Sequence, residues 1–182
     1  MEFPLPVGHQ FLPTDKELVS YYLFNKLFTQ THPSNDLEMS LIFDLYGSFE
    51  PWEIWQLHGG DNLKDDQALC FFTSLNKVSV NGSRIYRRVG SGTWAREDSG
   101  NKIKARNVVG FKERFSYKNQ HSPHDDACIM HEFAIHSAPD DIVLCQIKKN
   151  PRSSEKKRKL KDVIFKQSKH CKFTVPIPIQ TL

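Results

Sequence analysis

The spacing of apolar residues changes once along this chain, near residues 58–61, and that change limits the possible folds more than any other feature. Before it, apolar residues recur at helical intervals, and after it they gather in short runs that are typical of strands. A chain with helices first and a run of strands afterwards is predicted to be an α+β protein.

The first part contains two predicted helices. Thr14 and Glu17 have the spacing of a capping box, which starts the first helix. The apolar side chains of that helix share one face and are Leu18, Val19, Tyr22, Leu23 and Leu27. Residues 49–55 predict a short second helix with Pro51 in its first turn, where a missing N–H costs little.

The second part predicts a sheet. Its longest apolar segments of strand character are residues 68–73, 109–117, 128–135 and 142–147. A Gly-Ser-Gly corner at 90–92 precedes a further short segment, 93–96. The connections look short, and short connections join antiparallel strands, so we expect a largely antiparallel sheet.

Length and composition set the outer limits. A chain of 182 residues can form one domain with a buried core and a tail. No apolar run approaches the ~18 residues of a membrane span, and the N-terminus has no basic start, so we predict neither a membrane segment nor a secretory signal. The four cysteines lack paired spacing, which favours an intracellular, disulfide-free protein.

The charges are sorted into blocks. Residues 1–83 hold 4 basic and 11 acidic side chains, and residues 84–118 hold 10 basic and 3 acidic ones. Residues 119–147 hold 5 acidic side chains and no basic one, and residues 148–182 hold 11 basic and 2 acidic ones. The net charge of +4 therefore hides two strongly basic regions.

The basic block 84–118 predicts a surface for a polyanion, because clustered charge attracts an anion more strongly than scattered charge. Aromatic Tyr86 and Trp94 are interleaved with its basic residues. A β-ribbon can enter the major groove of DNA while Lys and Arg beside it hold phosphates. The alternative is a solvated face of the sheet.

One His/Cys pattern resembles the spacing of metal ligands, but it does not predict a metal site. His121, His124, Cys128 and His131 follow one another at ligand-like intervals. The first two lie in a polar loop, and the last two are three apart on a predicted strand, so their side chains face opposite ways. We predict no metal, no cofactor, no small-molecule substrate and no enzyme, since no catalytic motif is present.

The basic C-terminal region contains an unbroken run, Lys156, Lys157, Arg158 and Lys159. Such a run predicts nuclear import or a contact with nucleic acid. The alternative is a tail that only increases solubility. We place the domain boundary near Pro151, where the composition changes.

Several blocks, in chain order, resemble motifs of the NAC domain of plant transcription factors. Residues 6–18 resemble its opening PPGFRFxPTDEEL, and residues 90–94 resemble its GSGYW block. The other similar blocks are 44–52 (DVY…PW), 71–73 (YFF), 81–84 (NGSR), 109–112 (VGxK), 129–133 (IMHEY) and 143–149 (VLCRIxKK). The resemblance spans about residues 4–149.

This resemblance implies a twisted antiparallel sheet flanked by N-terminal helices, and a dimer that binds double-stranded DNA in the nucleus. It implies a DNA-binding and dimerisation domain at 4–150. The change in composition after Pro151 predicts a basic, disordered tail at 151–182. An outer strand would enter the major groove, with Trp94 and Arg96 at its edge. The predicted DNA-binding residues are Arg87, Arg88, Trp94, Arg96, Lys102, Lys104, Arg106, Lys112 and Arg114.

The chain departs from the family pattern at two places. An Arg of the family pairs across the dimer with a Glu, and these dimerisation positions are here Gln10 and Glu17. In the groove-reading stretch, Ala95 replaces a Lys, and the next residues include the acidic Glu97 and Asp98. Arg87 and Lys112 match their family positions directly.

Two functions follow as hypotheses. The first is a sequence-specific transcription regulator of the plant NAC type that acts as a homodimer or heterodimer on double-stranded DNA. The second is a short interaction protein that binds DNA weakly or not at all and modulates full-length relatives by pairing with them. Gln10, Ala95 and the short region after the domain motivate the second.

Overall fold

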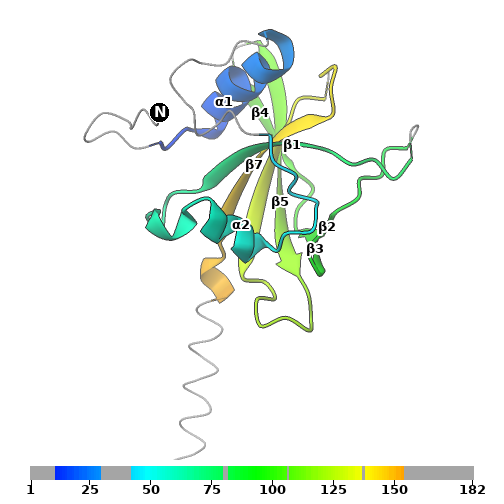
Figure 1. The fold of residues 1–182 in the computed structure, drawn as a ribbon. Helices are drawn as coiled ribbons and strands as arrows, with labels where there is room; N and C mark the ends of the chain where they lie inside the picture. Colours follow the sequence, from blue (N-terminus) through cyan, green and yellow to red (C-terminus); the bar gives the residue numbers. More distant parts are fainter. Residues whose placement is uncertain (1–10, 30–41, 80–81, 106, 137, 154–182) are drawn as a thin grey trace, which may run out of the picture. The chain divides into compact units, whose positions relative to one another are not determined.

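The computed structural model describes residues 11–29, 42–79, 82–105, 107–136 and 138–153 (Figure 1). The chain divides into two units, residues 1–149 and 150–182, and only residues 150–153 of the second are described. The assignment of separate functions to residues 4–150 and 151–182 stays a prediction.

The first helix begins at the predicted capping box. Thr14 Oγ1 accepts from the Glu17 N–H, and Glu17 Oε2 accepts from the Thr14 N–H at 2.7 Å. Helix α1, Asp15–Glu17, continues as the wider π-type turns η1, Leu18–Leu23, and η2, Asn25–Thr29. Leu18, Val19 and Leu23 are fully buried, so the predicted apolar face is confirmed.

The second predicted helix is also confirmed. Helix α2, Pro51–Leu57, starts with Pro at its first turn, and Glu53 accepts a hydrogen bond from the Glu50 N–H. Trp55 is buried, and Trp52 packs against the core from its edge. A short 3₁₀ turn, η4, Gly60–Asn62, follows the helix.

The strands form one antiparallel sheet. They are β1 Leu69–Ser74, β2 Arg88–Val89, β3 Gly92–Arg96, β4 Asn101–Ala105, β5 Val108–Lys118, β6 Cys128–Ala134 and β7 Ile142–Lys149. The order across the sheet is β1-β7-β6-β5-β3-β2, and β4 also pairs with β5. The predicted α+β class is therefore confirmed.

Strands β3 and β4 lie one after the other along the same edge of the long strand β5 (Figure 1). Arg96 is opposite Phe115, and Asn101 is opposite Lys112. Four residues, 97–100, therefore lie against only two, 113–114. We call the side of β5 formed by β2, β3 and β4 the outer edge of the sheet. The extra residues 97–100 form a bulge in this edge, and a bulge changes the direction in which the neighbouring side chains point.

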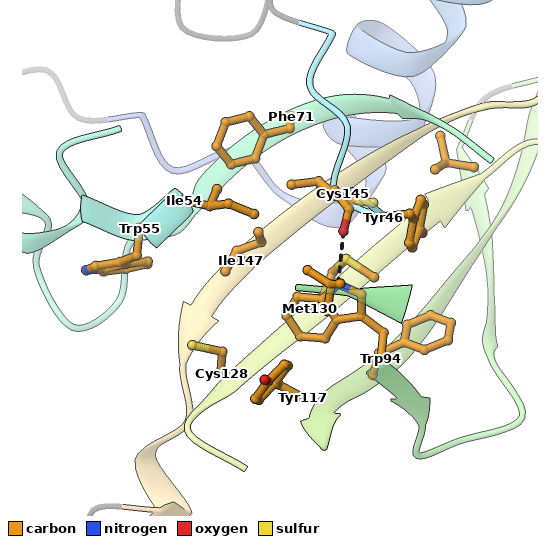
Figure 2. Close-up of a cluster of buried hydrophobic side chains, with 14 residues drawn as sticks. Tyr46, Ile54, Trp55, Phe71, Trp94, Tyr117, Cys128, Met130, Cys145 and Ile147 are labelled. Carbon is orange, nitrogen blue, oxygen red and sulfur yellow. Dashed lines mark hydrogen bonds between the residues drawn. The ribbon is translucent and has the colours of Figure 1, made fainter. Parts of the chain in front are cut away.

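The sheet has an apolar core on each face. On one face, α2 covers a cluster that includes Phe71, Trp94, Met130 and Cys145, and Trp94 Nε1 donates to the carbonyl of Leu45 at 3.3 Å (Figure 2). On the other face, the first helix covers a second cluster.

That second cluster contains Leu18, Leu23, Phe72, Phe133 and Leu144. Phe71 and Phe72 belong to different clusters because neighbouring strand residues point to opposite faces. Among the described residues, no helix combines the length and apolar character needed to cross a membrane.

Candidate nucleic-acid interface

The structure places the predicted DNA-binding residues around the outer edge of the sheet. Arg87 and Arg88 lie at β2, Trp94 and Arg96 on β3, Lys102 and Lys104 on β4, and Lys112 and Arg114 on β5. Arg106 lies outside the described residues, as do Gln10 and the run 156–159.

Lys102 and Lys104 are exposed on β4. They alternate with Ile103 and Ala105, which are buried, so the two lysines share one face of the strand. Arg88 is also exposed. Within the described part of the chain, Lys102, Lys104 and Arg88 have no carboxylate partner, so their charges are available to a ligand.

Arg87 is held inside the protein. Its Nη2 donates to Glu132 Oε1 at 2.9 Å, and its Nη1 lies against Glu132 Oε2 and the Tyr46 hydroxyl. The guanidinium also lies 4.4 Å from the ring centre of Phe115. The side chains of Arg87 and Glu132 are 18% and 5% exposed, so this pair lies inside the protein and is not available to a ligand.

The surroundings of Arg87 fix the protonation states of its guanidinium and of the neighbouring Tyr46 hydroxyl. Burial alone would lower the pKa of Arg87, but the hydrogen bond from Arg87 to Glu132 and the charge of Glu132 raise it above its ordinary value. Burial raises the pKa of the neighbouring Tyr46 hydroxyl well above its usual range. The guanidinium therefore stays charged and the phenol neutral.

Arg96 and Glu113 form an ion pair between β3 and β5. The pair lines a groove of about 540 Å³ on the face of the sheet that carries Trp94. Phe111 and His136 stack at 4.0 Å in the same groove. The side chain of Arg96 is 53% exposed and that of Glu113 is 21% exposed, so the guanidinium end of the pair is open to solvent.

The bulge brings a second arginine and glutamate together. The Glu97 N–H donates to the Arg114 carbonyl at 2.8 Å, and Arg114 Nε donates to the Glu97 carboxylate. Burial alone would raise the pKa of Glu97, but the hydrogen bond from Arg114 and its charge bring it below the ordinary value.

Asp98 organises the backbone of the bulge. Its Oδ1 accepts from the N–H groups of Gly100 and Arg114, each at 3.1 Å. Gly100 adopts a φ of 86°, which favours glycine. The Asp98 carboxylate is thus occupied by backbone donors.

Lys112 connects the sheet to the first helix. Its Nζ contacts both carboxylate oxygens of Asp15, at 2.8 and 2.9 Å.

Trp94 is 2% exposed, so its side chain lies in the core and not on the surface. Sequence reasoning missed the four carboxylates that pair with Arg87, Arg96, Lys112 and Arg114, which are Glu132, Glu113, Asp15 and Glu97.

At the predicted dimerisation position, Glu17 is part of the capping box. The hydrogen bond from the Thr14 N–H is the main cause that lowers the pKa of Glu17. To form an ion pair with another chain, the Glu17 carboxylate would have to break its hydrogen bond with the Thr14 N–H or accept a second donor beside it.

The residues of the ligand-like His/Cys pattern are separated. His124 stacks on Trp52 at 4.1 Å, and burial raises the pKa of Cys128 to about 11. His131 lines a different, small pocket with Lys112 and Lys148. Within the described ranges, no group of three or more His, Cys, Asp or Glu side chains is placed to hold a metal ion.

Comparison with known proteins identifies the family. The model of the "No apical meristem (NAM) protein" family matches residues 6–135. The chain is 31% identical to NAC domain-containing protein 40 of Arabidopsis thaliana over 147 residues, which are 79% of this chain and 42% of that protein.

Two other Arabidopsis thaliana relatives are similar. NAC domain-containing protein 96 is 33% identical over 72% of this chain and 44% of its own length. NAC transcription factor 32 is 28% identical over 86% of this chain and 64% of its own length. The chain thus spans less than half the length of the first of these relatives.

The match covers the capping box, α2 and strands β1–β6, so it extends over most of the sheet. The family is non-enzymatic, which confirms the prediction that the chain is not an enzyme. The chain belongs to the No apical meristem (NAM) family and is a homologue of the plant NAC domain proteins.

Proposed function

We propose that this chain is a transcription regulator of the NAC type that binds double-stranded DNA as a dimer in the nucleus. Family membership supports this proposal, and so does the name of its relative NAC transcription factor 32. The observation that carries it is the pair of exposed lysines on β4, Lys102 and Lys104, which have no carboxylate partner among the described residues.

The spacing of these lysines suits a DNA strand. Side chains two residues apart on a strand lie about 6.6 Å apart and point to the same face. Lys102 and Lys104 would therefore both face the backbone of one DNA strand, which carries a phosphate at every nucleotide. Such contacts position a protein on DNA, and base readout would come from the adjoining edge at β3.

Arg88 and Arg106 complete the proposed phosphate-binding set. Arg88 is exposed next to the Gly90–Gly92 corner, at the β3 end of the outer edge. Arg106 follows β4 directly in the sequence. Trp94 and Arg87 would act indirectly in this proposal, because their side chains are held in the core and shape the edge from behind.

The dimer and the nuclear location are further parts of the proposal. Lys156, Lys157, Arg158 and Lys159 would carry nuclear import. Gln10 and Glu17 would lie at the dimer contact, where a neutral amide replaces the arginine of the family. A Gln10→Arg variant should therefore self-associate more strongly than the natural chain in sedimentation experiments.

The internal ion pairs favour a second candidate function. Four of the basic residues expected to contact DNA, Arg87, Arg96, Lys112 and Arg114, already have carboxylate partners. A chain with so much of its basic charge neutralised would bind DNA weakly. It would then act by pairing with full-length relatives and modulating them.

Selection of bound duplexes from a random pool tests the first function, with the natural chain as bait. Enrichment of a common motif is expected. If no motif is enriched and no duplex binds at low salt, the DNA-binding proposal is wrong. Co-purification with a full-length NAC protein would then support the modulator, and failure to pair with any relative would exclude it.

A further inference from the structure

Two arginine–glutamate ion pairs cross between β5 and the β3 end of its neighbouring edge, and each side contributes one arginine and one glutamate. Arg96 of β3 reaches Glu113 of β5, and Arg114 of β5 reaches Glu97 of the bulge. We propose that Glu97 and Glu113 compete with DNA phosphate for these two arginines, so that Arg96 and Arg114 contact duplex DNA only by exchanging carboxylate for phosphate. This proposal rests on the DNA-binding function proposed above.

The register of the strands explains how the pairs form. Arg96 is opposite Phe115, and Glu113 is two residues away on β5, so Arg96 and Glu113 point to the same face. The bulge places Glu97 beside Arg114, as the backbone hydrogen bond between them shows. A regular strand would place only two residues opposite 113–114, and the bulge places four there. The bulge therefore brings Glu97 to Arg114 as the second competing carboxylate.

The exposure of the two pairs makes exchange feasible. The side chains of Arg96 and Arg114 are 53% and 26% exposed, so an incoming phosphate can reach both guanidinium groups. Ion pairs at a surface are weak because water screens them, and a bidentate phosphate is a strong alternative partner. The buried Arg87–Glu132 pair has no such access.

The local charge shows why exchange is needed. The bulge and the residues around it contain two basic side chains, Arg96 and Arg114, and three acidic ones, Glu97, Asp98 and Glu113. This stretch of the edge is therefore net negative by one charge. Asp98 is already bound by two backbone N–H groups, which leaves Glu97 and Glu113 as the competitors.

The test compares duplex binding by the natural chain, Glu97→Gln, Glu113→Gln and the double variant. Gln keeps the size of the side chain and one acceptor oxygen while it removes the charge. The control is Asp65→Asn with Asp66→Asn, which removes two exposed charges next to β1 at the opposite edge of the sheet. Circular dichroism checks that each variant is folded.

We expect each single variant to bind duplex about two- to fivefold more tightly than the natural chain. The slope of log K against log salt, measured between about 50 and 200 mM salt, should stay close to that of the natural chain, because the same two arginines contact phosphate in every complex. The double variant should show the larger gain in affinity, and the control should show no gain of this size.

The possible outcomes separate the two proposals. If the natural chain binds duplex and the Gln variants bind no more tightly than the control, the competition is contradicted while the proposed function stands. If no protein binds duplex, even the double variant, both proposals fail. If only the Gln variants bind, the competition is supported in its strongest form.

Discussion

Arg87 and Glu132 form a buried, bidentate ion pair that joins the residue before β2 to the middle of β6. The hydroxyl of Tyr46 donates to the same carboxylate, and the ring of Phe115 lies under the guanidinium. The pair therefore fastens the β2–β3 edge to the centre of the sheet.

Arg87→Ala should lower the free energy of unfolding by about 3–5 kcal/mol, because it leaves the Glu132 charge buried without a partner. Chemical denaturation measures this loss. Arg88→Ala is the matched control, because Arg88 is exposed and should change stability by no more than about 0.5 kcal/mol. Equal stability of the two variants would show that Arg87 has no structural role.

The elements of this fold were largely predictable because they depend on local signals. The capping box at Thr14, Pro51 at the start of α2 and the apolar strand runs all act within a few residues. The partners of the basic residues were not predictable in the same way. Arg96 meets Glu113 only because β3 pairs with β5 in one register, and a sequence does not state that register.

The bulge is the clearest example of what the sequence left open. In the sequence, Glu97 and Asp98 place negative charge in the stretch that resembles the groove-reading segment of the family. The structure gives each carboxylate a partner, because residues 97–100 loop out of the regular ladder. In the proposed DNA complex, Glu97 would give up Arg114 to a phosphate, whereas the Asp98 carboxylate would keep its backbone donors.

Asp98→Ala should destabilise the outer edge. The change removes the acceptor for the N–H groups of Gly100 and Arg114, and it should cost about 1–2 kcal/mol because the site is partly open to water. Urea denaturation measures the cost. Ser99→Ala, at the exposed neighbouring position, should be nearly neutral, and equal values for the two variants would contradict the structural role of Asp98.

Gly110→Ala should loosen the first helix from the sheet. A Cβ atom at this position would lie 2.6 Å from Cγ1 of Val19, so we expect a loss of about 1–3 kcal/mol. The same change should cost less in a Val19→Ala background, where the clash is relieved. Thermodynamic coupling between the two sites would be near zero if the helix did not pack on Gly110.

His131 should make stability depend on pH. Burial lowers the pKa of His131 to about 4, and the charges of Lys112, Arg114 and Lys148 act in the same direction. In the unfolded chain the pKa is 6.5, so the unfolded state binds the proton first as the pH falls. The contribution is therefore fully present above pH 6.5 and is lost as the pH falls towards 4.

We expect this loss to be about 1–2 kcal/mol, because partial exposure of His131 weakens the effect. Unfolding of the natural chain and of His131→Asn at about pH 7 and about pH 5 measures it. The natural chain should lose more stability than the variant between the two conditions. The same loss in both proteins would assign the pH dependence to other groups.

The central claim is that duplex DNA contacts the outer edge of the sheet through Lys102 and Lys104. The most direct measurement is the salt dependence of duplex binding by the natural chain, by the double variant Lys102→Gln/Lys104→Gln, and by a matched double variant, Lys16→Gln/Lys64→Gln. The last pair removes the same charge from exposed lysines outside the strands. We predict that only the β4 variant flattens the plot of log K against log salt, by about 1.8. Equal slopes and affinities for the two double variants would contradict the claim.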